Sequence, residues 1–528
     1  MLLLNNITYL HPNKDILFEH LNFSIQKNRK VALVGNNGAG KSTLFKIMAG
    51  VLSPAEGTVK AFAVPYYVPQ HFGQYDELTV AEALGVSDKI IALRAILDGD
   101  VSEENMALLN DDWTIEERCT EALDHWELKD LSLTQQMGSL SGGQKTKVFL
   151  AGISIHDPEI VLLDEPSNHL DIAGRELLYQ LITSATFTLV VISHDRKLLN
   201  LPDEVHELSK RGITVYGGNY DFYTEQKKSE NDALLNELKD REKSLRKAKE
   251  TERESAERQQ KLDARGKKKQ EKAGVPTIMM NTLRNNAEKS SAKLKSVHAE
   301  KTGNLSLELN QLRKELPETD KMKFGFDDSA LHKGKILLAA VEINFQYGAQ
   351  SLWDPAMDLQ ITSGERLALK GLNGSGKTTL IKLLLGKLKP TQGNLSRADH
   401  SSIYIDQDYS LIDNRLTVFE QAEKFNTTSL QEHEIKIRLN RFLFAKEDWN
   451  KPCSALSGGE RMRLVLCCLT IGHIAPDMII IDEPTNNLDM KNIGILTAAI
   501  NDYNGTLIVV SHDEYFLEKV NIQRSIQL

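Results

Sequence analysis

The 528-residue chain is long enough for two to four domains, and with 41% hydrophobic and 26% charged residues its composition is that of an ordinary soluble protein. No apolar run approaches the roughly 18 residues that a membrane span needs, and the opening MLLLNN lacks the features of a signal peptide. The formal net charge is −9 at pH 7. The four cysteines show no metal or redox spacing, so we expect a reduced, cytoplasmic protein.

The first strong pattern in chain order is KVALVGNNGAGKSTLFKIMAG, in which a short buried strand precedes Gly35–Ser42. That segment fits G-x-x-x-x-G-K-[ST], the phosphate-binding loop, and a helix follows it as the motif requires. Its glycines let backbone N–H groups converge on phosphate oxygens, while Lys41 reaches the β- and γ-phosphates and Ser42 offers a hydroxyl to Mg²⁺. The expected ATP-binding residues are Gly35, Asn36, Asn37, Gly38, Ala39, Gly40, Lys41, Ser42 and Thr43.

The same pattern returns as RLALKGLNGSGKTTLIKLLLG, and the two copies align without a gap over 7–35 and 343–371. A repeat of this length indicates duplication of a whole domain. We therefore predict a first domain at 1–223, a linker at 224–316 and a second domain at 317–528. The second set of ATP-binding residues is Gly371, Leu372, Asn373, Gly374, Ser375, Gly376, Lys377, Thr378 and Thr379.

Each copy also contains a hydrophobic strand that ends in Asp-Glu, in IVLLDEPSNHLD and MIIIDEPTNNLD. Asp164 and Asp482 end these strands, so their carboxylates are placed beside the phosphate loop to hold Mg²⁺ through water. The glutamates that follow, Glu165 and Glu483, can orient or deprotonate the attacking water.

A histidine follows each of these glutamates by 29 residues, at the end of another predicted strand. His194 and His512 are therefore candidates for a γ-phosphate contact through the imidazole. The alternative is a histidine that only satisfies local hydrogen bonds at a strand end.

Together with LSGGQ and LSGGE upstream, these blocks resemble the ATP-binding-cassette (ABC) ATPases over both domains. The resemblance implies that Gln70 and Gln407 are Q-loop residues that reach Mg²⁺ and water. It also implies that each signature faces the ATP of the opposite domain, within a single chain that works as a monomer. The signature residues are Ser141, Gly142, Gly143 and Gln144, expected to complete the site of Lys377, and Ser457, Gly458, Gly459 and Glu460, expected to complete that of Lys41.

The same resemblance predicts an aromatic residue that stacks on adenine near the start of each domain. Tyr347 fits this role in the second domain, and His11 occupies the aligned position in the first, with Tyr9 two residues earlier. The copies differ most between Q-loop and signature, where the first domain has 21 extra residues of helical character. These residues are either an enlarged helical subdomain or a small contact arm.

The linker is a charged, leucine-spaced segment that predicts an antiparallel helical hairpin turning near 273–276, AGVP. Residues 261–301 carry eleven basic and four acidic side chains, whereas 224–260 carry ten of each. A basic tip on an acidic protein suggests a polyanionic partner; lysines that serve only solubility are the alternative.

Twin ABC domains joined by a charged hairpin, with EPSNHLD and EPTNNLD, resemble the ABC-F subfamily. The fold class expected is α/β: two P-loop NTPase domains joined by a long antiparallel α-helical coiled coil. The resemblance implies ATP and Mg²⁺ as cofactors and the ribosome (rRNA and tRNA, at the tRNA exit site) as partner, in translation or in antibiotic protection. Candidate RNA contacts at the tip are Lys267, Lys268, Lys269, Lys272 and Arg284.

Two alternatives remain at this point: an ATP-binding subunit of a separate membrane exporter, and a DNA-associated ATPase whose basic tip meets DNA phosphate.

Overall fold

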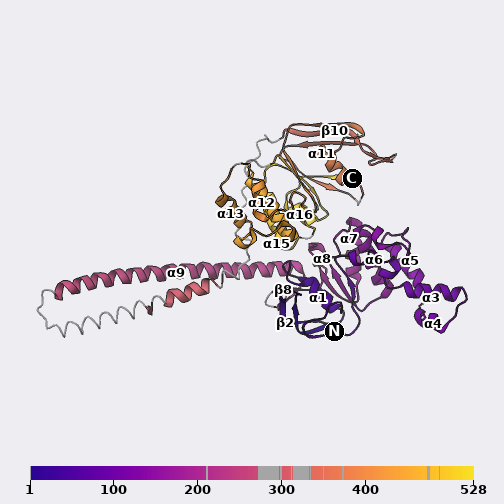
Figure 1. Cartoon of the computed structure of the whole chain (residues 1–528), viewed down its shortest axis with the longest axis horizontal. Helices are drawn as coiled ribbons and strands as arrows, with labels where there is room; N and C mark the ends of the chain where they lie inside the picture. The colour runs from indigo at the N-terminus through magenta and orange to yellow at the C-terminus, as the bar shows by residue number, and fades with distance from the viewer. Residues whose placement is uncertain are drawn as a thin grey trace. The chain divides into compact units, whose positions relative to one another are not determined.

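The computed structural model describes residues 2–12, 14–209, 212–270, 296–297, 300–310, 312, 332, 334–348, 350–371, 374–427, 429–472, 476–486 and 488–528. The chain divides into two compact units, one made of Met1–Asp221 with Met322–Leu528 and the other of Phe222–Lys321. The first unit contains both copies of the repeated domain, and the second contains the linker (Figure 1).

The first domain is built on a six-stranded sheet in the order β5-β6-β7-β3-β8-β9. All neighbouring pairs are parallel except β8 with β9. Strands β6 and β7 are buried at every position, as expected for parallel strands covered on both faces. The strands are β3 (Lys30–Val34), β5 (Tyr66–Val68), β6 (Ile160–Asp164), β7 (Thr188–Ile192), β8 (Glu204–Ser209) and β9 (Gly212–Gly217).

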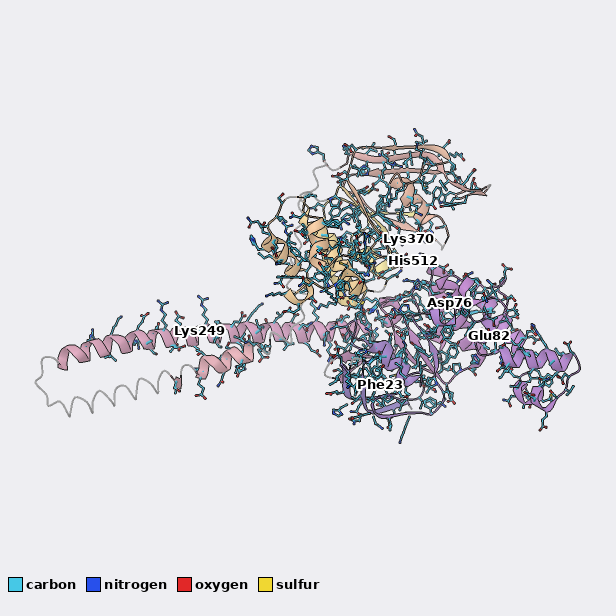
Figure 2. All side chains as sticks on the ribbon, viewed as in Figure 1. Phe23, Asp76, Glu82, Lys249, Lys370 and His512 are labelled. Atoms are coloured by element: carbon cyan, nitrogen blue, oxygen red, sulfur yellow. The ribbon has the colours of Figure 1, made fainter. Side chains whose placement is uncertain are left out.

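A second, antiparallel sheet in the order β2-β1-β4 lies against the first and shares its core. Its strands are β1 (Leu2–Leu10), β2 (Ile16–Ile25) and β4 (Glu56–Ala61). Phe23 of β2 is buried there, together with Phe45 of the helix that follows the phosphate loop (Figure 2). The phosphate loop is therefore anchored between two sheets.

Helices α1 to α8 complete the first domain, and α3 and α4 account for the extra residues between Q-loop and signature (Figure 1). The expectation of helical structure there is met, with Trp126 buried just after α5. The helices are α1 (Lys41–Met48), α2 (Val80–Ala83), α3 (Ser87–Leu97), α4 (Glu103–Leu109), α5 (Ile115–His125), α6 (Gly142–His156), α7 (Ile172–Ser184) and α8 (Arg196–Leu199), with 3₁₀ turns η1 (Gly73–Tyr75) and η2 (Met137–Ser139).

The second domain repeats the arrangement with a five-stranded parallel sheet in the order β16-β17-β18-β14-β19. An antiparallel sheet β13-β10-β15 and a short β11-β12 hairpin accompany it. The strands are β10 (Ile336–Asn344), β11 (Gln346–Tyr347), β12 (Gln350–Ser351), β13 (Met357–Thr362), β14 (Arg366–Lys370), β15 (Gln392–Arg397), β16 (Ser402–Ile405), β17 (Met478–Asp482), β18 (Thr506–Val510) and β19 (Arg524–Gln527).

The helices of the second domain occupy the positions that the repeat predicts. Thr417 caps α12 with the same capping box that Thr79 makes at α2 in the first domain. They are α11 (Lys377–Leu384), α12 (Val418–Lys424), α13 (Glu432–Arg441), α14 (Gly458–Ile471), α15 (Met490–Asp502) and α16 (Glu514–Lys519), with 3₁₀ turns η4 (Lys446–Asp448) and η5 (Cys453–Ala455).

The outbound arm of the linker is one continuous helix, α9 (Tyr220–Gln270), of 51 residues. Such a helix is about 75 Å long. Lys249 projects from its exposed surface (Figure 2), and Arg241 pairs with Glu308 of the return arm at 3.1 Å. The described part of the return arm (296–297, 300–310 and 312) is helical, and the Arg241–Glu308 pair joins it to the outbound arm. The predicted turn at 273–276 lies outside the described residues.

Within the described ranges, no helix combines the length and the apolar character required to cross a membrane.

Candidate functional site

The two phosphate loops differ in sequence at three positions, yet their glycines, where the structure describes them, have matching backbone conformations. Gly38 and Gly40 have φ angles of 78° and 95°, and Gly374 and Gly376 have 84° and 94°. These left-handed values suit glycine, and loops of this kind let successive backbone N–H groups converge beside a helix N-terminus, here at Lys41 and Lys377. Each loop therefore forms an anion-binding concavity at a helix N-terminus.

The loop lysines are folded back onto their own backbone. Lys41 Nζ donates to the carbonyl oxygens of Gly35 at 2.8 Å and Asn36 at 3.2 Å, and Lys377 Nζ donates to that of Gly371 at 2.7 Å. Burial lowers the pKa of both lysines. Ser375 Oγ is buried without a hydrogen-bond partner among the described residues. These groups fit an anionic phosphate chain, which would supply the missing acceptors.

The predicted metal ligands of the first domain meet at the carboxyl end of β6. Ser42 Oγ donates to Asp164 Oδ1 at 3.2 Å, and Gln70 lines the same cleft of ≈ 390 Å³. In the second domain, Thr378, Asp482 and Gln407 line a cleft of ≈ 550 Å³.

One carboxylate and one hydroxyl, with the other positions left to phosphate and water, suit Mg²⁺ at nucleotide sites. The described part of the chain contains no cluster of three or more His, Cys, Asp or Glu side chains that could hold a metal without nucleotide. Ser42, Asp164 and Gln70, and their counterparts in the second domain, would hold Mg²⁺, which neutralises phosphate charge when bound.

Both candidate bases occupy an unusual backbone conformation. Glu165 has a φ of 53° and Glu483 a φ of 45°, which is the left-handed region that β-carbon-bearing residues rarely adopt. The backbone N–H of each glutamate donates a hydrogen bond of 2.8 Å to the carbonyl oxygen of the last residue of the neighbouring strand, which is Ile192 for Glu165 and Val510 for Glu483. This bond fixes a sharp turn directly after the strand, and the side chain is thereby directed into the cleft. Strain of this kind costs about 1–3 kcal/mol and is often found at functional sites.

The environment of these carboxylates suits general base chemistry near neutral pH. Burial raises the pKa of Glu165 and of Glu483 to about 7. Glu165 Oε2 accepts from the backbone N–H of His194 at 3.2 Å, whereas Glu483 Oε2 is buried without a hydrogen-bond partner among the described residues. A buried acceptor of this kind is where a water molecule can bind.

Each glutamate lies beside the predicted histidine. His194 Nε2 is 3.2 Å from Glu165 Oε1, and His512 Nε2 is 3.4 Å from Glu483 Oε1. Burial lowers the pKa of both imidazoles to about 4, so both are neutral at pH 7 and can donate a hydrogen bond without carrying charge.

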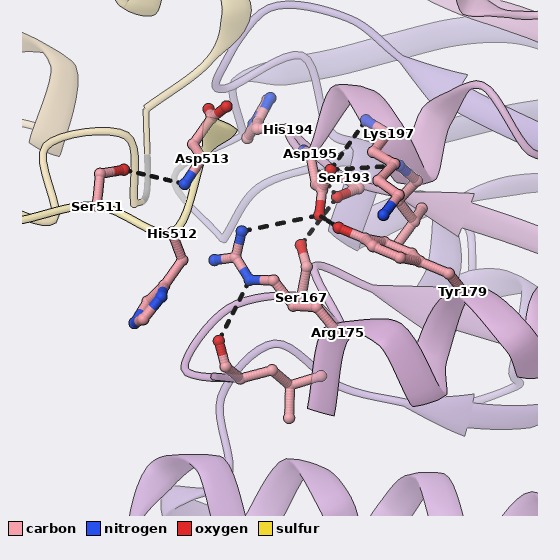
Figure 3. Close-up of polar contacts among 12 residues, drawn as sticks. Ser167, Arg175, Tyr179, Ser193, His194, Asp195, Lys197, Ser511, His512 and Asp513 are labelled. Carbon is pink, nitrogen blue, oxygen red and sulfur yellow. Dashed lines mark hydrogen bonds and ion pairs between the residues drawn. The ribbon is translucent and has the colours of Figure 1, made fainter. Parts of the chain in front are cut away.

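A helix of the same domain holds the His194 loop in place (Figure 3). Asp195 caps α8 by accepting from the N–H groups of Lys197 and Leu198 at 3.0 and 3.2 Å. Tyr179 donates its hydroxyl to Asp195 Oδ2 at 2.5 Å, and Arg175 lies 3.8 Å from the same oxygen. Because both partners come from α7, that helix restrains the loop that carries His194.

The signature segments are explained by local chemistry. Ser141 and Gln144 form a reciprocal capping box at the start of α6, and Ser457 and Glu460 form the same box at α14. Glu460 also pairs with Lys451 at 2.8 Å. The glutamate therefore preserves the turn that glutamine makes, and its charge is balanced by the lysine.

The structure brings part of the second domain to the Lys41 site. Ser457 lines the cleft around Lys41, and Asp489 Oδ2 accepts from the N–H of Asn37 in the phosphate loop at 3.1 Å. The lining of the Lys377 cleft, as far as the structure describes it, comes from the second domain alone and does not include Ser141.

The predicted adenine-stacking residues lie at the mouths of the clefts. Tyr347 lines the Lys377 cleft with 61% of its surface exposed, and its hydroxyl lies 3.0 Å from Thr379 Oγ1. His11 lines the Lys41 cleft. Their stacking role stays a prediction, and Leu372 and Asn373 lie outside the described residues.

Sequence reasoning overlooked three residues near these clefts. Asp489 ends the block EPTNNLD, as Asp171 ends the corresponding block EPSNHLD, and this repetition was the available signal. Tyr67 and Tyr404 each donate to a strand-end aspartate, and their shared position three residues before Gln70 and Gln407 was the signal there.

Two phosphate loops, each with a strand-end Asp-Glu pair and a histidine, define the class: a twin-cassette P-loop ATPase. A family model described as ABC transporter matches residues 18–168 and 355–486. The putative ATP-binding protein YdiF of Bacillus subtilis is 31% identical over 96% of this chain and 77% of its own.

Two further relatives match over nearly the whole chain. ABC transporter F family member 5 of Arabidopsis thaliana is 29% identical over 96% of this chain and 71% of its own. The ribosome protection protein VmlR of B. subtilis is 28% identical over 98% of this chain and 84% of its own. The chain belongs to the ABC-F family of ATP-binding-cassette ATPases.

The fold has a solved counterpart in an archaeal ribosome recycling factor, crystallised with a ribosomal stalk protein. The TM-score is 0.61 at 19% identity, with 99% of this chain and 87% of that chain covered. At this identity the likeness concerns the fold alone.

We expect the Glu165→Gln, Glu483→Gln double variant to lose ATP hydrolysis by at least about 100-fold, because a positioned general base contributes that much or more. Nucleotide binding should be retained, since the phosphate loops are unchanged. Steady-state phosphate release and equilibrium binding of a fluorescent ATP analogue measure the two properties. Hydrolysis within a few-fold of the parent would show that neither glutamate is the base.

We also expect kcat/KM for ATP to rise with pH through about 7, because only the ionised form of a carboxylate accepts a proton and burial places the pKa of Glu165 and Glu483 near that value. Rates measured between about pH 5.5 and 8.5 test this. The residual activity of the double glutamine variant serves as control and should lack the inflection. A rate that stays flat below pH 7 in the parent enzyme contradicts the assignment.

Proposed function

We propose that this protein is a ribosome-associated ATPase that acts at the tRNA exit site as a monomer, in the cytoplasm. In this proposal, binding of ATP closes the two cassettes on each other, and the closed protein remains on the ribosome. Hydrolysis at the Glu165 and Glu483 sites then reopens the cassettes and releases the protein.

The observation that carries the proposal is similarity to a ribosome protection protein over 98% of the chain, linker included. The similarity therefore extends beyond the two ATPase cassettes, which alone would fit many ABC proteins. The likeness in fold to a ribosome recycling factor is consistent with it, at the level of architecture.

The Lys41 site supports coupling between ATP and cassette closure. Ser457 and Asp489 of the second cassette both reach the cleft or loop that holds Lys41. A nucleotide there would contact both cassettes and favour the closed state, because a ligand stabilises the conformation that binds it better. Loss of the γ-phosphate would remove part of that preference.

The linker supports an RNA contact at its tip. Its outbound helix is 51 residues long, and the excess of basic residues is confined to 261–301. Of the candidate residues, Lys267, Lys268 and Lys269 lie in the last turn of α9, whereas Lys272 and Arg284 lie outside the described residues. A cluster of lysines and arginines binds phosphate groups without regard to sequence, which suits folded RNA.

We expect the Glu165→Gln, Glu483→Gln variant to sediment with ribosomes through a sucrose gradient when ATP is present, because without hydrolysis the cassettes stay closed. The Lys41→Ala, Lys377→Ala variant is the control and should stay at the top, since it lacks the lysines that bind phosphate. A glutamine variant that stays at the top at low salt would exclude the ribosome as partner. Recovery with membranes would favour an exporter subunit, and release by DNase but not RNase would favour a DNA-bound ATPase.

We expect alanine at the five basic tip residues to weaken ribosome binding and to reduce its salt dependence. The slope of the logarithm of the binding constant against the logarithm of the salt concentration should fall by up to about one for each phosphate group that is no longer bound. The ATP-trapped variant, titrated with ribosomes at several salt concentrations, provides the measurement. A matched control replaces five exposed lysines of the charge-balanced stretch 224–260: Lys228, Lys239, Lys243, Lys247 and Lys249. Equal weakening in both variants would contradict a specific role for the tip.

A further inference from the structure

A tyrosine in each cassette donates a hydrogen bond to the aspartate that ends the next strand of the sheet. Tyr67 OH lies 3.3 Å from Asp164 Oδ2, and Tyr404 OH lies 2.9 Å from Asp482 Oδ2. The contact thus recurs at corresponding positions in both copies of the repeated domain.

The strand register explains how both tyrosines reach the same target. Tyr67 of β5 is paired with Leu162 of β6, and Tyr404 of β16 is paired with Ile480 of β17. In each case the aspartate lies two residues further along the partner strand, on the same face of the sheet. The phenol ring spans this distance, so its hydroxyl meets the carboxylate at the sheet's edge.

The contact fixes the carboxylate of Asp164 from both sides. Its Oδ1 accepts from Ser42 Oγ at 3.2 Å, and its Oδ2 accepts from Tyr67. The aspartate is only 1% exposed, so water contributes little to holding it. With one donor on each oxygen, rotation about the side-chain bond would break a hydrogen bond, and the oxygen beside Ser42 stays directed at the phosphate loop.

We propose that Tyr67 and Tyr404 are positioning residues for Mg²⁺: each holds its aspartate in the orientation that the ion requires. The inference rests on the proposed role of Asp164 and Asp482 as metal-facing carboxylates, and it is independent of any ribosome contact. Hydrogen bonds of this outer-shell kind typically change metal affinity 10- to 100-fold when they are removed.

The aromatic rings have a separate, structural role that the test must leave intact. Tyr67 packs edge-on against Phe45 in the core of the first domain, with ring centroids 6.4 Å apart. The ring of Tyr404 lies under Lys387 Nζ at 5.7 Å. Phenylalanine keeps both rings and removes only the hydroxyl groups, so Tyr67→Phe and Tyr404→Phe isolate the contacts with the aspartates.

The chain offers a matched control in the adjacent residue. Tyr66 is half-buried beside Tyr67, and its hydroxyl donates a 2.9 Å hydrogen bond to the carbonyl oxygen of Phe149 instead of to a carboxylate. Tyr66→Phe therefore removes a hydroxyl of the same kind, from the same strand, without touching Asp164.

The experiment measures binding of a fluorescent ATP analogue as a function of Mg²⁺ concentration, in the Glu165→Gln, Glu483→Gln background so that no turnover occurs. We expect the Tyr67→Phe, Tyr404→Phe substitutions to raise the Mg²⁺ concentration for half-maximal binding roughly tenfold. Affinity for the analogue without metal should be unchanged, and Tyr66→Phe should behave like the parent. Direct titration with Mn²⁺ by electron paramagnetic resonance should show the same shift.

Two results would overturn the proposal. The first is an unchanged metal dependence in the double phenylalanine variant, and the second is an equal change in Tyr66→Phe, which would indicate a general effect of losing a buried hydroxyl. Asp164→Asn, Asp482→Asn serves as reference: if it too leaves the metal dependence unchanged, the carboxylates do not face the metal and the inference fails with them. None of these readouts involves the ribosome, so the outcome is separate from that of the proposed function.

Discussion

The structure depends on keeping two adjacent carboxylates largely out of water at the end of one strand in each cassette. Both are buried in the first cassette, whereas in the second Glu483 is buried and Asp482 is half-buried. Asp164 is 1% exposed and Glu165 is 6% exposed, and removal of charged groups from water costs several kcal/mol each. In the first cassette, hydroxyl groups stabilise the aspartate, while a backbone N–H stabilises the glutamate. The left-handed turn at the glutamate separates the two side chains, so that one faces the predicted metal position and the other faces the histidine.

The same constraint is met differently in the two cassettes. In the first, both oxygens of Glu165 have partners in the His194 loop. In the second, one oxygen of Glu483 is buried without a hydrogen bond among the described residues. The Lys41 cleft also receives Ser457 from the opposite cassette, whereas the described lining of the Lys377 cleft is local. The two sites, whose candidate catalytic residues correspond, thus differ in the partners of the glutamate and in the described lining of the cleft.

Much of the fold was predictable because its determinants are local. The phosphate loops require glycine at defined positions, and the signature segments are capping boxes whose serine and Gln or Glu are only three residues apart. The predicted fold class agrees with the twin-cassette architecture. The long linker helix followed from the absence of proline and glycine between Thr224 and Arg265.

The remaining features could not be predicted because they depend on register and on contacts between distant segments. No local pattern indicates that Glu165 has a positive φ, since the bond that holds it comes from β7. The Tyr67 contact depends on how β5 pairs with β6, and the Asp489 contact joins residues 452 positions apart. Repetition between the two copies was the one available signal for such residues.

In the proposed mechanism, each nucleotide is held by one cassette's loop and strand-end carboxylates, and closure adds residues of the other cassette. A crystal structure of the Glu165→Gln, Glu483→Gln variant with ATP and Mg²⁺ tests this most directly. We predict nucleotide in the Lys41 cleft in contact with Ser457, with Tyr67 still bonded to Asp164 beside the metal. Nucleotide bound there without any contact from the second cassette, or a metal remote from Asp164, would contradict the account.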